Sequence, residues 1–88
     1  MNIQSQQITL RFNTTVRTDS DELLLSLRRV WMGEATIAIG RVGAITHEER
    51  LKVGDEIRYG PYVFGHFEIR LLEIGKDDTA LFLVTRLS

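Results

Sequence analysis

The sequence contains no cysteine, and this absence excludes several kinds of protein at once. It leaves no disulfide framework, no thiolate metal site and no cysteine nucleophile. We therefore expect neither a bound metal nor a cofactor. A chain of 88 residues is expected to form one small domain, residues 1–88, with a thin margin of stability. Self-association is the simplest way for such a domain to gain support.

A strong net charge and a long apolar run are also missing. The chain carries 11 basic and 12 acidic residues, so its overall field does not attract nucleic acid or anionic membrane. Nine of the 11 cations are arginines, which favour interfaces and leave room for a local basic face. No apolar run approaches the roughly 20 residues that span a bilayer. Residues 1–7 lack the pattern of a signal peptide, so we expect a cytoplasmic protein with no membrane segment.

The sequence also lacks the motifs of common catalytic sites. There is no Gly-x-Ser-x-Gly elbow, and neither His47 nor His66 has an identifiable catalytic partner. The adjacent residues His47, Glu48 and Glu49 do not have the spacing that brings metal ligands to one helix face. Gly40–Gly43 lacks the lysine of a phosphate-binding loop. We expect no catalytic residues and no enzyme, and keep a small enzyme as a second alternative.

Among the residues that are present, Gln7–Arg17 alternates between apolar and polar side chains. This period of two is typical of a half-buried strand. The side chains expected on its inner face are Ile8, Leu10, Phe12, Thr14 and Val16.

The next segment changes to a helical rhythm. Thr18–Glu22 is rich in N-cap residues, and Gly33 stands where a helix often ends. Apolar residues recur at helical spacing at Leu23, Leu24, Leu27, Val30 and Trp31. The pattern predicts one main helix over Ser20–Met32. The rival interpretation is a strand from Leu23 to Val30.

The remaining segments are predicted mainly as strands. Ala35–Val42 and Glu56–Tyr59 have strand patterns, whereas Thr46–Lys52 fits either one helical turn or an irregular loop. The runs His66–Ile74 and Ala80–Leu87, separated by a polar turn, predict a β-hairpin. The fold class is therefore α+β and β-rich, with one main helix. About five or six short, mostly antiparallel strands would form a curved sheet or small barrel.

Two groups of residues are candidates for binding. A continuous apolar run would be buried on both faces, and its second cover could be another subunit. The predicted homodimer interface is Leu81, Phe82, Leu83 and Val84. Aromatic residues gather around Gly60-Pro61, and an arginine pair precedes Trp31; both could bind a partner, although core packing also explains the aromatics. The candidate partner-binding residues are Tyr59, Tyr62, Phe64, Arg28 and Arg29.

The segment Leu27–Gly40 has an arginine pair before Gly-Glu and then an alternating strand that ends in glycine. It resembles the opening strands of the carbon storage regulator family of RNA-binding dimers, and the Phe67–Val84 hairpin is similar to that family's central hairpin. The resemblance implies RNA binding through Arg28, Arg29 and Arg86, and a strand in place of the predicted helix. The chain departs from the family because Trp31 and Met32 lengthen the first turn and residues 43–65 separate the two matching parts.

These observations favour a non-enzymatic binding module that acts by contact with another, unidentified protein. It would serve as an adaptor, an inhibitor or an antitoxin-like or anti-defence protein. The alternative is a module that binds RNA or single-stranded nucleic acid through arginine and exposed aromatic side chains.

Overall fold

A computed structural model describes residues 4–17, 23–40, 47–62 and 65–86, and in these ranges the chain consists of strands and turns. None of the described residues is helical, so no helix among them could cross a membrane. The expected α+β class, with one main helix and five or six strands, is wrong: the described residues have an all-β arrangement of eight strands. They are β1 Gln4–Arg11, β2 Thr15–Arg17, β3 Leu24–Trp31, β4 Glu34–Gly40, β5 His47–Lys52, β6 Glu56–Tyr62, β7 Gly65–Ile74 and β8 Thr79–Arg86.

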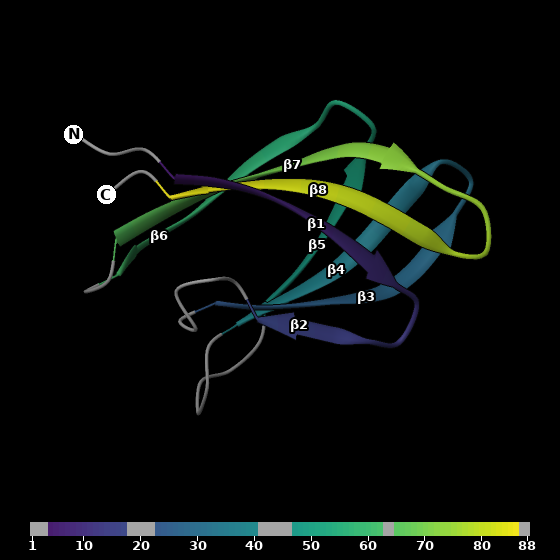
Figure 1. Ribbon diagram of the computed structural model, residues 1–88, viewed down its shortest axis with the longest axis horizontal. Helices are drawn as coiled ribbons and strands as arrows, with labels where there is room; N and C mark the ends of the chain where they lie inside the picture. The colour runs from purple at the N-terminus through teal and green to yellow at the C-terminus, as the bar shows by residue number, and fades with distance from the viewer. Residues whose placement is uncertain (1–3, 18–22, 41–46, 63–64, 87–88) are drawn as a thin grey trace.

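The strands form two four-stranded antiparallel sheets (Figure 1). The first sheet has the order β1-β8-β7-β6 and the second has the order β2-β3-β4-β5. In the view of Figure 1 the first sheet lies in front of the second. Each sheet buries one face against the other, which leaves each with one outer face.

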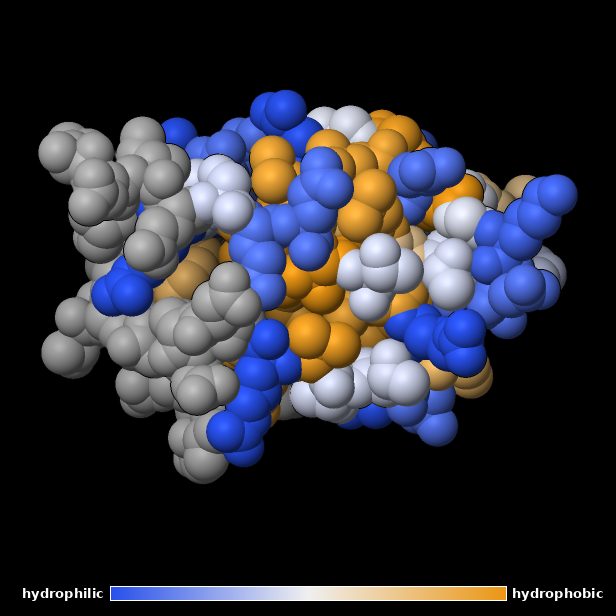
Figure 2. Space-filling model, in the orientation of Figure 1, coloured by the Kyte–Doolittle hydropathy of each residue, from blue (hydrophilic) through white to orange (hydrophobic). Residues whose placement is uncertain are grey.

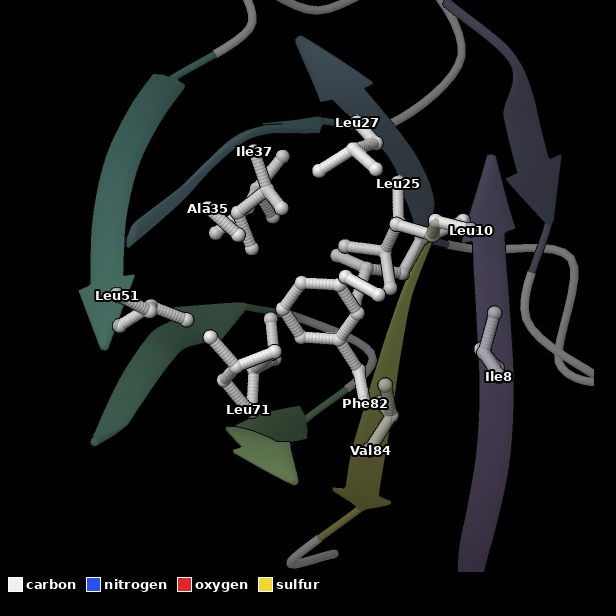
Figure 3. Close-up of a cluster of buried hydrophobic side chains, with 14 of the residues drawn as sticks. Ile8, Leu10, Leu25, Leu27, Ala35, Ile37, Leu51, Leu71, Phe82 and Val84 are labelled. Atoms are coloured by element: carbon white, nitrogen blue, oxygen red, sulfur yellow. The ribbon is translucent and has the colours of Figure 1, made fainter. Parts of the chain in front are cut away.

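The core lies between the two sheets, and the described side chains that form it are all apolar. Figure 3 shows Phe82 of β8 in the middle of this cluster. The first sheet supplies two buried phenylalanines, Phe67 and Phe82, whereas the buried side chains of the second sheet are aliphatic. The members of the core from the second sheet, together with the residue before β3, are Leu23, Leu25, Leu27, Ala35, Ile37, Ile39 and Leu51. Ala38 of β4 is also buried, although it alternates with the core residues.

The segment predicted as the main helix, Ser20–Met32, forms the strand β3 in its described part. This agrees with the rival interpretation, a strand from Leu23 to Val30. Leu23, Leu25 and Leu27 are fully buried at every second position, as a strand requires. A β-bulge between Leu27 and Arg29 then adds one residue, and Val30 returns to the core side. The resulting spacing of three between Leu27 and Val30 imitates a helix. The predicted N-cap cluster, 18–22, lies outside the described residues.

The predicted strand Gln7–Arg17 is divided between the two sheets. β1 ends at Arg11, and β2 begins at Thr15. Between them Asn13 has a positive φ of 65°, and its N–H donates a hydrogen bond to the carbonyl of Leu27 in the second sheet. Ile8 and Leu10 are buried as expected, but Phe12 is exposed at the crossing.

The segment predicted as a helical turn or loop, Thr46–Lys52, is the strand β5 in its described part. The predicted hairpin is confirmed, because β7 and β8 pair along their length. Ile57 and Tyr59 of β6 pack against the core, as their alternation indicates.

Candidate binding surface on the second sheet

The outer face of the second sheet is built from side chains that alternate with the core residues. The strand register places Arg29 of β3 beside Thr36 of β4, and Thr36 beside Arg50 of β5. Two interstrand spacings separate the arginines, roughly 10 Å. β3 and β5 therefore present long charged side chains on either side of β4, whose outer residues Thr36 and Ala38 are short.

Positive charge accumulates on this outer face. We call its five cations the basic face: Arg17, Arg28, Arg29, Arg50 and Lys52. Among the described residues, only the two carboxylates Glu34 and Glu48 share this surface, which leaves a surplus of three positive charges within the described part of the face. None of the five cations forms an ion pair with another described residue. Their charges are therefore not neutralised by the described part of the fold.

The outer face of the first sheet has the opposite arrangement. Arg58 lies 3.6 Å from the carboxylate of Glu68 on the next strand. Arg70 forms a hydrogen-bonded ion pair with Glu56 across the same two strands. Arg58 and Arg70 are thus paired with acids opposite them, in contrast to the cations of the basic face, whereas Arg11 at the end of β1 forms no ion pair with another described residue.

Trp31 stands at the end of the basic face. Its side chain is 60% exposed, although tryptophan usually buries most of its large apolar area. The Arg29 guanidinium lies over the indole at 5.5 Å from the ring centroid, a cation–π contact. The guanidinium covers one side of the ring only, so the exposed indole offers its other side to a ligand.

Met32 follows Trp31 at the tip of the β3–β4 hairpin and is 83% exposed. Met32 and Gly33 have φ values of 50° and 79°, the two positive angles of a type I′ turn. Glycine and asparagine favour the first of these positions, whereas a methionine there costs about 1 kcal/mol or more. The sequence therefore keeps a strained and solvated apolar side chain beside Trp31.

The predicted partner residues are placed differently from one another. Tyr59 is half-buried: its hydroxyl donates to the carbonyl of Ile39 at 3.5 Å, and its ring stacks with His47 at 6.3 Å. It thus joins the two sheets and is not an outward anchor. The side chains of Tyr62 and Phe64 lie outside the described residues.

Arg28 and Arg29 are exposed on the basic face, the former at the bulge. The sequence did not indicate that Arg50 and Lys52 share a surface with this arginine pair, because Thr46–Lys52 was interpreted as a helical turn or a loop. The signal that could have found them is the alternation around Leu51, the one buried side chain of that strand. Trp31 was predicted among the apolar residues of the helix because it fitted the helical spacing.

The predicted dimer residues divide between the two faces of β8. Phe82 and Val84 belong to the core of this chain, whereas Leu81 and Leu83 are half-buried on the outer face. Leu72 of β7 is half-buried beside them. Figure 2 shows hydrophobic side chains over the middle of this face, with hydrophilic ones around them. Only Leu81 and Leu83 of the predicted set could contact a second copy.

His47 is held by its neighbours on the inner edge of β5. Its Nε2 lies 2.6 Å from Oε1 of Glu49, and its ring contacts Tyr59. In the described ranges no three His, Asp or Glu side chains gather as a metal site. The contacts of His47 join β5 to β6, which is a structural role.

Comparison of the chain with protein-family models, with curated proteins and with solved structures finds no match in any of the three. The resemblance to the carbon storage regulator family thus gains no support, and the family is not assigned. The functional argument depends on the surfaces described above.

Proposed function

We propose that this protein is a non-enzymatic binding module that holds nucleic acid against the basic face. The observation that carries the proposal is the surplus of cations without ion pairs among the described residues on the outer face of one sheet. Phosphates that contact such cations release their counterions, which favours binding at low salt. Four of the five cations are arginines, whose planar fork binds phosphate through two hydrogen bonds.

The shape of the sheet face also supports a chain-like ligand. On β4 the half-buried Thr36 lies between Arg29 and Arg50, so a phosphate backbone that crosses the sheet at Thr36 would meet cations on both sides; Ala38, further along β4, is buried. The cytoplasm, the compartment expected from the sequence, contains such ligands. The proposal replaces the aromatic group around Tyr59 as the binding site, because Tyr59 is committed to contacts within the fold.

Salt titration tests the proposal. Binding of labelled 12-nucleotide single strands of DNA and RNA would be measured by fluorescence anisotropy between 50 and 200 mM salt, and the affinity should fall steeply. Each phosphate contact contributes about 0.7 to the log–log slope for single strands. The Arg29→Gln, Arg50→Gln double variant should therefore lower the slope by roughly 1.4.

The matched control removes two arginines from the other sheet. Arg58→Gln, Arg70→Gln makes the same change in net charge but leaves the basic face intact, so it should keep the wild-type slope. Absence of binding at 50 mM salt, or an equal loss in both double variants, would refute the proposal.

A protein partner is the second candidate, favoured by the exposure of Trp31 and Met32 beside Arg29. Exposed tryptophan, methionine and arginine are enriched in protein interfaces. A protein bound mainly through these apolar side chains would stay bound after nuclease treatment, and its affinity would depend little on salt because apolar contacts are not screened.

A homodimer remains part of the proposal, through Leu81 and Leu83 on the outer face of the first sheet. Acidic and basic residues alternate around these leucines, as the Arg58–Glu68 and Arg70–Glu56 pairs show. A surface with both signs of charge can complement a second copy of itself about a two-fold axis.

A further inference from the structure

We infer that Trp31 and Met32 at the tip of the β3–β4 hairpin form a stacking site that makes the protein prefer single-stranded to duplex nucleic acid. The inference rests on the proposed function and adds the class of nucleic acid that is bound. Single-strand binders combine a cationic track with aromatic side chains on which unpaired bases stack. In a duplex the bases are stacked on one another, so they cannot reach such a ring.

The β-bulge at Arg28 gives this site its orientation. Leu27 faces the core opposite Ile37, and in a regular strand the outward positions after it would be residues 28 and 30. The bulge shifts the register by one residue, so Arg29 and Trp31 point outward and Val30 points inward. Bulges commonly re-aim side chains in this way. The same bulge that gave this strand a helical spacing in the sequence thus brings Arg29 and Trp31 to one face.

Arg29 prepares the indole for stacking. Its guanidinium lies on one side of the ring at 5.5 Å from the centroid, which restrains the ring and leaves the other side for a base. A base bound there has its phosphates next to Arg29 and to Lys52, which is two strands away across Glu34. The stacking site is therefore continuous with the basic face.

Met32 supplies a second reason to regard the tip as selected for contact. A positive φ at a non-glycine residue is strained, and strain of this kind is enriched at functional sites. Nothing in the core benefits from this side chain, because it is 83% exposed. A flexible and polarizable thioether can adapt to the face of a base next to the one on Trp31.

Trp31 is the one tryptophan of the chain, so its intrinsic fluorescence reports on the site directly. Titration with a 12-nucleotide single strand should quench this fluorescence, whereas a 12-base-pair duplex should leave it nearly unchanged. The variant Trp31→Leu should lose about ten-fold or more in affinity for the single strand, measured by anisotropy, and almost none for the duplex. Phe12→Leu is the matched control, because Phe12 is an exposed aromatic side chain at the β1–β2 crossing. It should bind like the wild type.

Met32→Asn provides a variant whose effect cannot come from unfolding. Asparagine suits the turn better than methionine, so the midpoint of urea unfolding should rise while single-strand affinity falls.

The outcomes separate the two proposals. If neither nucleic acid binds, the proposed function fails and the stacking site fails with it. If single strands bind without quenching the tryptophan fluorescence and Trp31→Leu binds as well as the wild type, nucleic-acid binding by the basic face is supported and the stacking site is refuted. A preference for duplex would also refute it.

Discussion

The two sheets of this protein differ in what their inner and outer faces contribute. The first sheet places Phe67 and Phe82 in the core, and on its outer face two arginines are paired with acids. The second sheet buries aliphatic side chains and leaves the cations of its outer face without ion pairs among the described residues. Both sheets contribute to the core, and the difference between their outer faces is the reason that we propose the second sheet as the binding surface.

The largest effect is expected from the core of the first sheet. Phe82→Ala should lower the free energy of unfolding by about 3–5 kcal/mol. A chain of this length has roughly 4–13 kcal/mol in total at 0.05–0.15 kcal/mol per residue, so the variant should be near the limit of folding. Urea unfolding followed by circular dichroism measures the loss.

Leu83→Ala is the control for that loss, because Leu83 is the next residue of β8 and is half-buried on the outer face. It should cost much less than Phe82→Ala. Similar losses at both positions would contradict the placement of Phe82 at the centre of the core.

A change of oligomeric state is the second effect in size. We expect sedimentation to show a dimer at high micromolar concentration, and Leu83→Lys to convert it to a monomer because the lysine would be buried in the contact. Thr36→Lys places the same side chain at a half-buried position on the outer face of the second sheet, and should remain dimeric. A wild-type monomer would remove the dimer from the proposal.

The β7–β8 hairpin could be predicted from the sequence because its signals agree. Phe67, Ile69 and Leu71 alternate over the inner face, and a polar turn separates them from the apolar run of β8. That continuous run was expected to need a second cover. In the structure Leu81 and Leu83 are half-buried among polar neighbours. The sequence carries no signal that distinguishes an apolar run with both faces covered from one whose outer side chains stay half-buried.

The candidate site could be predicted only in part, since it depends on contacts that are distant in sequence. The arginine pair at Arg28 and Arg29 was visible, but the bulge between Leu27 and Arg29 gives β3 a helical spacing, so Trp31 was predicted on the apolar side of a helix. Arg50 joins the site through its pairing with Thr36, and the alternation of this short polar edge strand is marked by one buried residue, Leu51, which is too weak a signal to predict a strand. Local patterns therefore identified the arginine pair as a candidate for binding, but they did not predict the sheet that brings it together with the other cations.

The smallest effect distinguishes the two outer faces without any ligand. Arg70→Gln removes a partner of Glu56, so it should lower the free energy of unfolding by about 0.2–1 kcal/mol, as for other partly exposed ion pairs. Arg50→Gln removes a cation with no ion pair to a described residue and lessens repulsion among the five on its face, so it should leave stability unchanged or slightly higher. Urea unfolding at low salt measures both, and 1 M salt should remove most of the difference because it screens surface charges. If Arg50→Gln proved the more destabilising of the two, its guanidinium would have a partner within the fold, and the basic face would lose the free charge on which nucleic-acid binding depends.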